Sequence, residues 1–191
     1  MIQPRIDSIK AQAYLAFALK RYKRTAFSRP LVLGIRGYYL DSMGAKGRNE
    51  RGIYDDAIVV VSPTAVAAFN GNTDPSAFRD GVASLIPGVH PYRPGNHGIT
   101  RPGGGYPAFR PATKNEELPV MRDGQTKPSV GVAINIHRGG TTGTSSLGCQ
   151  TIHPSQWDAF HALLTLELKR ANVKVFDYVL VDEIQFREAQ K

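Results

Sequence analysis

Apolar residues form short runs in the middle of the chain and recur at helical spacing near its two ends. The short runs contain many β-branched residues and are bounded by turn-forming residues, a pattern that predicts strands. The expected strands cover residues 31–36, 57–61, 82–86, 130–136 and 178–184. Gly- and Pro-rich stretches separate them. The longest stretch, residues 87–113, exceeds ordinary connections and predicts a loop that could wall a substrate groove.

The spacing near the N-terminus predicts a helix from Asp7 or Ser8 to about Arg21, ending in basic residues that the helix dipole favours. Its regularly spaced residues are Ile9, Ala13, Ala16, Phe17 and Lys20. Most of the apolar ones are Ala, so we expect the helix to pack on the domain, with a membrane-active role as the alternative.

A second helix is predicted from Pro154, which suits the first helical position, to about Ala171. Its apolar stripe consists of Trp157, Phe160, Leu164 and Leu168. We expect this stripe, including the tryptophan, to lie in the core.

These elements indicate a mostly β protein with flanking helices, of the α+β class. A chain of 191 residues suffices for one domain with a sizeable core. We therefore expect a single domain over residues 1–191, with residues 1–28 as an N-terminal helical extension of a core formed by residues 29–191.

The charge balance is basic, with 24 Lys and Arg against 16 Asp and Glu and a formal net charge of +8. Such a balance favours a polyanionic partner, such as nucleic acid, an anionic membrane surface or the bacterial cell wall. The sequence contains no basic helix, zinc-ligand spacing or aromatic-basic motif of a nucleic-acid binder, so we expect no nucleic acid partner. We expect a monomer.

Two features bear on where the protein acts. The sequence lacks the run of about 18 apolar residues that predicts a membrane span. Residues 1–24 carry Asp7 and Lys10 ahead of a short apolar stretch and lack a small-residue cleavage site, so they do not predict a secretory signal. We therefore expect synthesis in the cytoplasm.

Candidate chemistry lies in residues 132–152, VAINIHRGGTTGTSSLGCQTI, where an apolar strand leads into a Gly/Thr/Ser loop that ends on the only cysteine. A thiol becomes a strong nucleophile as the thiolate, and a nearby imidazole can lower its pKa and accept its proton. His137 precedes Cys149 by twelve residues, a loop length that allows the side chains to meet. We expect Cys149 as nucleophile, with a pKa below the ordinary value, and His137 as base.

The glycine before the thiol has its own expected purpose. Gly148 can adopt backbone angles closed to other residues and lets a substrate carbonyl approach the main chain. The backbone N–H groups of Gly148 and Cys149, with Leu147 as a possible third, could form an oxyanion hole worth about 3 to 4 kcal/mol per donor.

This segment resembles the catalytic signature of the L,D-transpeptidase (YkuD-type) family, on Ile136-His137-Arg138-Gly139 followed by Ser146-Leu147-Gly148-Cys149. A looser resemblance extends from residue 57 to residue 152. It includes residues 87–92, which are similar to the family's Pro-Gly turn before an aromatic strand.

The resemblance implies an L,D-transpeptidase-like β-sandwich, a thioacyl-enzyme on Cys149, His137 as its base and Ser146 near the active site. Arg138, Gly139, His97 and Tyr92 are the expected substrate-binding residues. Leu147 stands where the family has a histidine, and Thr151 where it has arginine or asparagine. These departures leave the acyl acceptor open between water and an amine.

The small size, the basic charge and the missing secretory signal favour a phage or prophage-derived lysis enzyme that reaches peptidoglycan after membrane permeabilisation. Its reaction would be hydrolysis of a stem-peptide bond. The alternatives are an authentic L,D-transpeptidase that forms cross-links and a non-catalytic wall-binding or virion protein.

Other candidate residues have simpler explanations. His90 and His97 fall in the expected loop, where solvated histidines are common, although either could contact substrate or orient His137. His153 precedes Pro154, where capping is the simplest role. Arg138 could grip a stem-peptide carboxylate through its bidentate fork or be a solvated loop charge.

Residues 54–56 and 70–74 suggest metal or sugar sites at first sight, but Asx turns explain both. The motifs HExxH of zinc peptidases and Gly-x-Ser-x-Gly of serine hydrolases are absent. We expect no metal and no cofactor, because a thiol, an imidazole and backbone donors suffice for acyl transfer.

Overall fold

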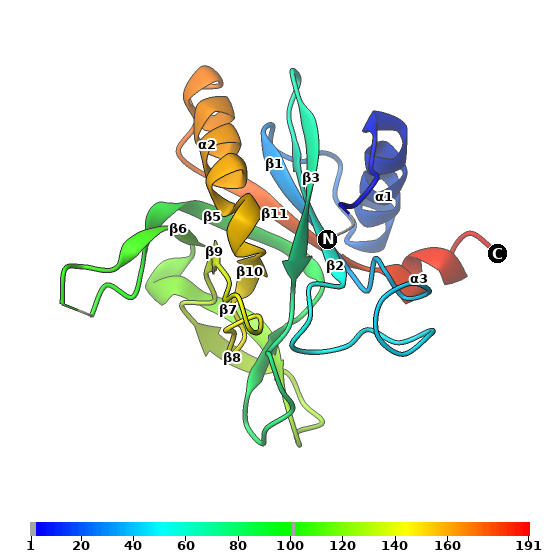
Figure 1. The fold of residues 1–191 in the computed structure, drawn as a ribbon. Coiled ribbons are helices and arrows are strands. Elements are labelled where there is room, and N and C mark those ends of the chain that lie inside the picture. Colours follow the sequence, from blue (N-terminus) through cyan, green and yellow to red (C-terminus); the bar gives the residue numbers. More distant parts are fainter. Residues whose placement is uncertain (1–2, 101) are drawn as a thin grey trace.

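The computed structural model describes residues 3–100 and 102–191, and its strands form a closed barrel beside a small sheet (Figure 1). Neighbouring barrel strands follow the order β1-β11-β5-β6-β9-β10-β3-β2. They are β1 (Leu31–Arg36), β2 (Asp56–Val61), β3 (Val66–Asn72), β5 (Gly88–His97), β6 (Tyr106–Pro111), β9 (Ile136–Arg138), β10 (Gln150–Ile152) and β11 (Phe176–Asp182). The small sheet has the order β4-β7-β8, from β4 (Ala83–Leu85), β7 (Glu117–Arg122) and β8 (Ser129–Val132). The mostly β, α+β class is therefore confirmed, whereas the strands close into a ring in place of the two facing sheets of the expected sandwich.

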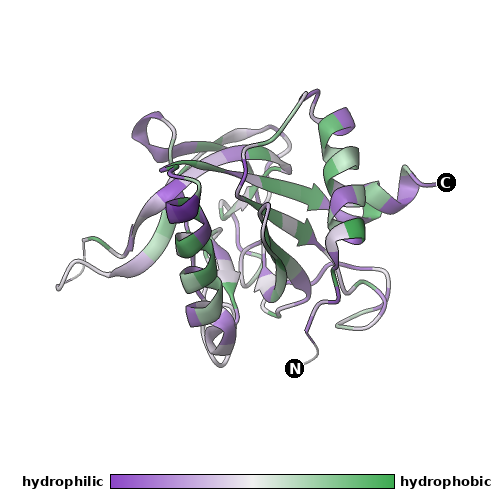
Figure 2. Cartoon of the chain, turned by 90° about the horizontal axis from the view of Figure 1, so that it is seen from above, coloured by the Kyte–Doolittle hydropathy of each residue, from purple (hydrophilic) through white to green (hydrophobic). Residues whose placement is uncertain are grey.

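The helices α1 (Ser8–Arg21), α2 (Pro154–Arg170) and α3 (Glu183–Glu188) flank the strands, with α1 and α3 on one side and α2 on the other (Figure 1). Every residue from Leu31 to Ile35 is buried, because both faces of β1 are covered. Val32 joins the cluster that contains α2, and Leu31 and Leu33 join the one that contains α1. In Figure 2 the strands between these helices are strongly hydrophobic.

The expected apolar stripe of α2 is confirmed. Its four residues, Trp157, Phe160, Leu164 and Leu168, are buried in the same hydrophobic cluster as side chains of the barrel strands. The face predicted for α1 is wrong. Ile9 is 79% exposed, and the helix instead buries Ala11, Tyr14, Leu15 and Ala18. These four lie one to two positions from the predicted set, and their packing on β1, β2 and β11 decides the orientation of the helix.

The predicted loop over residues 87–113 is wrong. Most of it forms the hairpin of β5 and β6, in which Tyr92 pairs with Pro111 and His97 with Tyr106. The prolines in this segment argued against strands, because proline lacks the N–H group that donates hydrogen bonds between neighbouring strands. Pairing with β11 on its other side holds β5 in the barrel.

The strand predicted over residues 130–136 is interrupted. Ala133 has a positive φ of 55°, which ends β8 and redirects the chain from the small sheet into β9 of the barrel. This turn brings the backbone around Ala133 and Asn135 to the cysteine. No helix in the described part of the chain is long and apolar enough to cross a membrane.

Candidate active site

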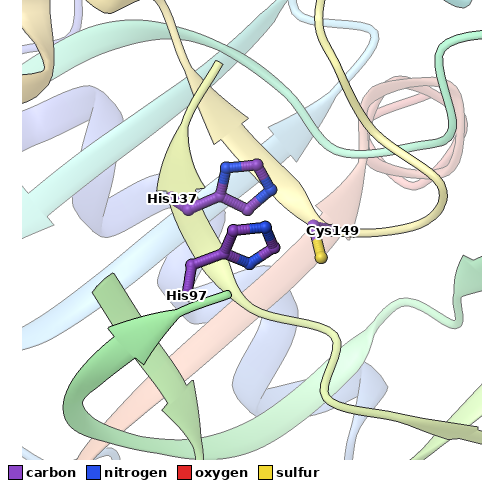
Figure 3. A group of neighbouring side chains, drawn as sticks. All are labelled: His97, His137 and Cys149. Carbon is purple, nitrogen blue, oxygen red and sulfur yellow. The ribbon is translucent and has the colours of Figure 1, made fainter. Parts of the chain in front are cut away.

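His97 comes together with His137 and Cys149, which are twelve residues apart in the sequence (Figure 3). His137 lies on β9, Cys149 immediately precedes β10, and His97 ends β5. The parallel strands β9 and β10 place Thr151 opposite His137, so the residue before β10 lies at the same end of the pair. One ring nitrogen of each histidine and the cysteine Sγ lie within 4.8 Å of one another. The predicted proximity of His137 and Cys149 is confirmed.

The orientation of His137 suits a general base. Its Nδ1 lies 2.7 Å from the backbone oxygen of Arg138, which can only accept a hydrogen bond. Nδ1 therefore carries the proton of the neutral ring, and Nε2 carries the lone pair. The Tyr106 hydroxyl, 3.0 Å from the same Nδ1, contributes a second contact on that side of the ring.

His97 lies against the base. Its ring stacks on that of His137 with centroids 3.9 Å apart and planes inclined by 21°. The side-chain amide of Asn135 lies 3.1 Å from its Nδ1. His97 is partly exposed and His137 is buried, so His97 separates the base from solvent on one face.

The thiol of Cys149 sits among backbone groups of the turn after β8. The Asn135 N–H approaches Sγ at 3.4 Å, and Sγ lies 3.7 Å from the Ala133 oxygen. Burial raises the pKa of Cys149 to about 11, outweighing the Asn135 hydrogen bond that lowers it. The expectation of a lowered pKa is therefore wrong: the thiol is neutral near pH 7, and a base must remove its proton during attack.

Ser146 organises the loop before the thiol. Its hydroxyl accepts a hydrogen bond from the Gly148 N–H at 2.9 Å and donates one to the Cys149 oxygen at 2.7 Å. The Gly148 N–H is thus occupied and does not serve as the expected oxyanion donor. The Cys149 N–H remains as the candidate, and Leu147, with a 69% exposed side chain, stands at the surface.

Gly148 has a structural reason to be glycine. Its φ is +130°, and a Cβ there would overlap the carbonyl oxygen of Ala83 on β4. The absence of a side chain at Gly148 thus lets the Ala83 carbonyl approach closely. The expectation was that it would admit a substrate carbonyl.

A polar pocket of about 310 Å³ opens beside the histidines. It is lined by His97, Tyr106, His137, Arg138, Gly139 and Ser145. The Arg138 guanidinium lies over the Tyr106 ring, 5.5 Å from its centroid, and its side chain is exposed. The expected substrate residues Arg138, Gly139 and His97 therefore share this pocket.

The fourth expected substrate residue, Tyr92, does not reach the pocket. Its side chain is fully buried in the barrel core and its hydroxyl donates to the Ile134 oxygen at 2.6 Å. Pairing of β5 with both β6 and β11 turns it inward, so its assignment to substrate binding is wrong. His90 is likewise buried, with Nε2 2.9 Å from the Ile86 oxygen.

The remaining candidates have structural roles. His153 caps α2 as expected, accepting from the Ser155 N–H at 3.3 Å. At residues 70–74, Asn70 and Asn72 lie on β3 and not in a turn, although the Asn72 amide still donates to the nearby Asp74 oxygen. Before β2, the Asp55 carboxylate accepts from the Glu50 N–H at 2.8 Å. The Asp56 carboxylate accepts from the N–H groups of Gly37 and Thr73 and so joins three distant segments.

Sequence reasoning missed Tyr106 and Asn135, which contact the two histidines. Neither stands in a recognisable motif. Tyr106 reaches the site because the hairpin register sets it opposite His97, and Asn135 because the turn at Ala133 directs it there. The comparisons with family models, curated proteins and solved structures find no match for this chain.

Proposed function

We propose that the protein is a peptidoglycan hydrolase, a cysteine peptidase that cleaves a stem-peptide bond through a thioacyl-enzyme. The observation that supports this most is the orientation of His137, whose Nδ1 bond to the Arg138 oxygen leaves the Nε2 lone pair as base near Cys149. The resemblance of residues 136–149 to the L,D-transpeptidase signature and the net charge of +8 support the wall as substrate. The assignment of the barrel to an L,D-transpeptidase-like catalytic domain belongs to the same proposal.

In the proposed first step, Sγ attacks the peptide carbonyl carbon while its proton moves to Nε2 of His137. The carbonyl π electrons move to oxygen, beside the Cys149 N–H as the donor in the loop. When the tetrahedral intermediate collapses, the C–N bond breaks and the imidazolium returns the proton to the leaving amine.

The thioacyl-enzyme is then hydrolysed. A water molecule in the pocket lined by His97 and His137 loses a proton to Nε2 as its oxygen attacks the thioester carbon. The C–S bond breaks, the sulfur takes the proton back, and the new carboxylic acid leaves. The exposed guanidinium of Arg138 supplies a positive charge for a stem-peptide carboxylate.

The test is incubation of purified peptidoglycan with the wild-type protein, Cys149→Ala and His137→Ala, followed by mass spectrometry of the soluble fragments. His161→Gln is the matched control, since this histidine lies on α2 and packs against Trp157 of the same helix and Phe109 of β6. We expect peptide release by wild type and the control alone. Equal release by Cys149→Ala would overturn the proposal, new cross-links without release would indicate a transpeptidase, and wall binding without turnover would indicate a binding protein.

The place of action is part of the proposal. As a lysis enzyme, the protein would reach peptidoglycan once the membrane is permeable. Adding the protein to intact bacterial cells and to cells permeabilised by a pore former, and following turbidity, tests this. Clearing only of the permeabilised cells is expected.

A further inference from the structure

The cluster of His97, His137 and Cys149 contains the donor set of a transition-metal site. Two imidazole nitrogens and a sulfur suit Zn²⁺, whereas Mg²⁺ and Ca²⁺ prefer oxygen donors. The three donor atoms lie within 4.8 Å of one another and come from β5, β9 and the residue before β10 of the barrel. Such a preformed arrangement lowers the conformational cost of binding an ion.

The separations are close to those that zinc requires. Zn–N bonds of about 2.0 Å and a Zn–S bond of about 2.3 Å place tetrahedral donors roughly 3.4 to 3.6 Å apart. The donors must therefore close by about 1 Å. His97, which ends β5 and is partly exposed, is the ligand best able to move.

The groups behind the histidines match the second shell of a metal site. A ligating histidine usually has its other ring nitrogen held by a carbonyl, an amide or a carboxylate, which fixes the ring orientation. Here Nδ1 of His137 donates to the Arg138 oxygen, whereas Nδ1 of His97 lies 3.1 Å from the amide nitrogen of Asn135, which can only donate a hydrogen bond. The ligating atom of His137 is then Nε2. For Nε2 of His97 to ligate, its Nδ1 must carry the ring proton, and the Asn135 amide must rotate so that Oδ1, which is buried without a hydrogen-bond partner among the described residues, accepts that proton. Figure 3 shows the ends of both rings directed towards Cys149.

A pocket adjoins the two histidines of the cluster. It has a volume of about 310 Å³ and is lined by both histidines and by Tyr106, although not by Cys149, so a fourth ligand such as water would approach the ion from the histidine side. Three protein ligands plus an open position is a common arrangement for zinc.

We propose that His97, His137 and Cys149 bind one Zn²⁺ ion, and that the bound ion blocks the thiol as a nucleophile. A sulfur lone pair forms the Zn–S bond, the thiol proton passes to solvent, and Nε2 of His137 is occupied by the metal. Zinc binding stands by itself, whereas the block of peptide cleavage rests on the proposed hydrolase function.

The binding test uses the full chain without a histidine tag. Calorimetric titration with ZnCl₂ is expected to give one site per chain, and CoCl₂ is expected to give the charge-transfer band of a thiolate-cobalt bond. His97→Gln and Cys149→Ala should each weaken Zn²⁺ binding at least about tenfold, since even second-shell changes have that effect. The matched control His161→Gln should bind like wild type. Failure of wild type to bind, or equal binding by His97→Gln, would overturn the site.

The functional test adds ZnCl₂ to the peptidoglycan release assay and then removes it with a chelator. Loss of release that the chelator reverses is expected. Unchanged or faster release at saturating Zn²⁺ would overturn the block. Zn²⁺ binding by a protein that releases no peptide even without zinc would support the metal site and contradict the hydrolase, which keeps the two failures distinct.

Discussion

At the scale of single residues, the environment of Cys149 decides its reactivity. The sequence places a thiol near an imidazole, an arrangement typical of a lowered pKa. The structure surrounds the sulfur with backbone and core groups, and burial raises its pKa to about 11. The thiol therefore resembles a serine hydroxyl in its need for a base during attack.

This environment predicts a slow reaction of Cys149 with iodoacetamide at neutral pH. The neutral thiol is favoured in the folded state, so the alkylation rate should keep rising with pH beyond the usual thiol pKa of about 8.5. Stopped-time alkylation followed by mass spectrometry measures the profile, and the urea-unfolded chain, expected to titrate near the ordinary value, is the control. A folded-state midpoint below the unfolded one would contradict the burial effect.

Tyr106 is expected to be a positioning residue for His137. Tyr106→Phe removes the hydroxyl 3.0 Å from Nδ1 but leaves the stronger Arg138 contact at 2.7 Å. The rate of peptide release should fall less than tenfold, against about 100-fold or more for His137→Ala. The pH–rate profile should shift in Tyr106→Phe while substrate affinity stays constant. An unchanged profile would mean that the hydroxyl has no influence on the base.

At the scale of elements, the loop before β10 depends on backbone geometry. Gly148→Ala would force a Cβ against the Ala83 oxygen at a φ of +130°, where side chains are strained. We expect a loss of at least about 1 to 3 kcal/mol in the free energy of unfolding. Urea denaturation measures it. Gly143→Ala, in the same loop with open space around its Cβ position, should change stability little.

Asp55, directly before β2, should make stability depend on pH. Burial raises the pKa of Asp55 to about 6, so protonation is favoured in the folded state. Protonation of Asp55 contributes to the free energy of unfolding. This contribution is fully present below the unfolded-state pKa of about 3.9 and is lost as pH rises through the folded-state pKa of about 6.

Asp55→Asn should therefore stabilise the protein more at pH 7 than at pH 4, relative to wild type. The asparagine oxygen can still accept the Glu50 N–H bond that Asp55 accepts at 2.8 Å. Urea denaturation of both proteins at the two pH values gives the difference. Equal effects at pH 4 and pH 7 would contradict the raised pKa.

At the scale of the whole molecule, α1 belongs to the domain. Its buried face completes a second core on the outer side of β1, β2 and β11, opposite the core that α2 completes. The Tyr14 hydroxyl also donates to Glu183 of α3 at 2.6 Å, linking the two ends of the chain. The N-terminal segment is thus a structural layer of the protein.

Because α1 completes this second core, truncating one buried side chain of the helix should strongly destabilise the protein. Leu15→Ala, at a side chain 2% exposed, should lower the free energy of unfolding by about 2 to 5 kcal/mol. Ile9→Ala, on the same helix but 79% exposed, should change it by less than about 0.5 kcal/mol. Thermal or urea unfolding measures both, and similar losses would show that the helix packs by another face.

Much of the fold and part of the site could be predicted from local patterns. The strand β1 and the helix α2 follow from apolar runs and spacing, because burial of those residues is the main stabilising force. The hairpin of β5 and β6 could not be predicted in this way, since its prolines oppose strand formation locally. Its strands are held in place by pairing with β11 and β9. Likewise, the sequence does not show that Tyr106 and Asn135 belong to the site. The pairing register of β5 and β6 places Tyr106 there, and the turn at Ala133 places Asn135.

The sequence by itself determined which groups are available: one thiol, a strand-borne histidine and a glycine-rich loop, all within a short segment. The tertiary structure alone decided how they behave. Barrel closure brought His97 onto His137, the Arg138 carbonyl set the tautomer of the base, and burial raised the pKa of the thiol. Proton affinity and donor geometry depend on the backbone conformation, as at Arg138, and on neighbours that are distant in sequence, as His97 is from His137, which is why local patterns do not contain them.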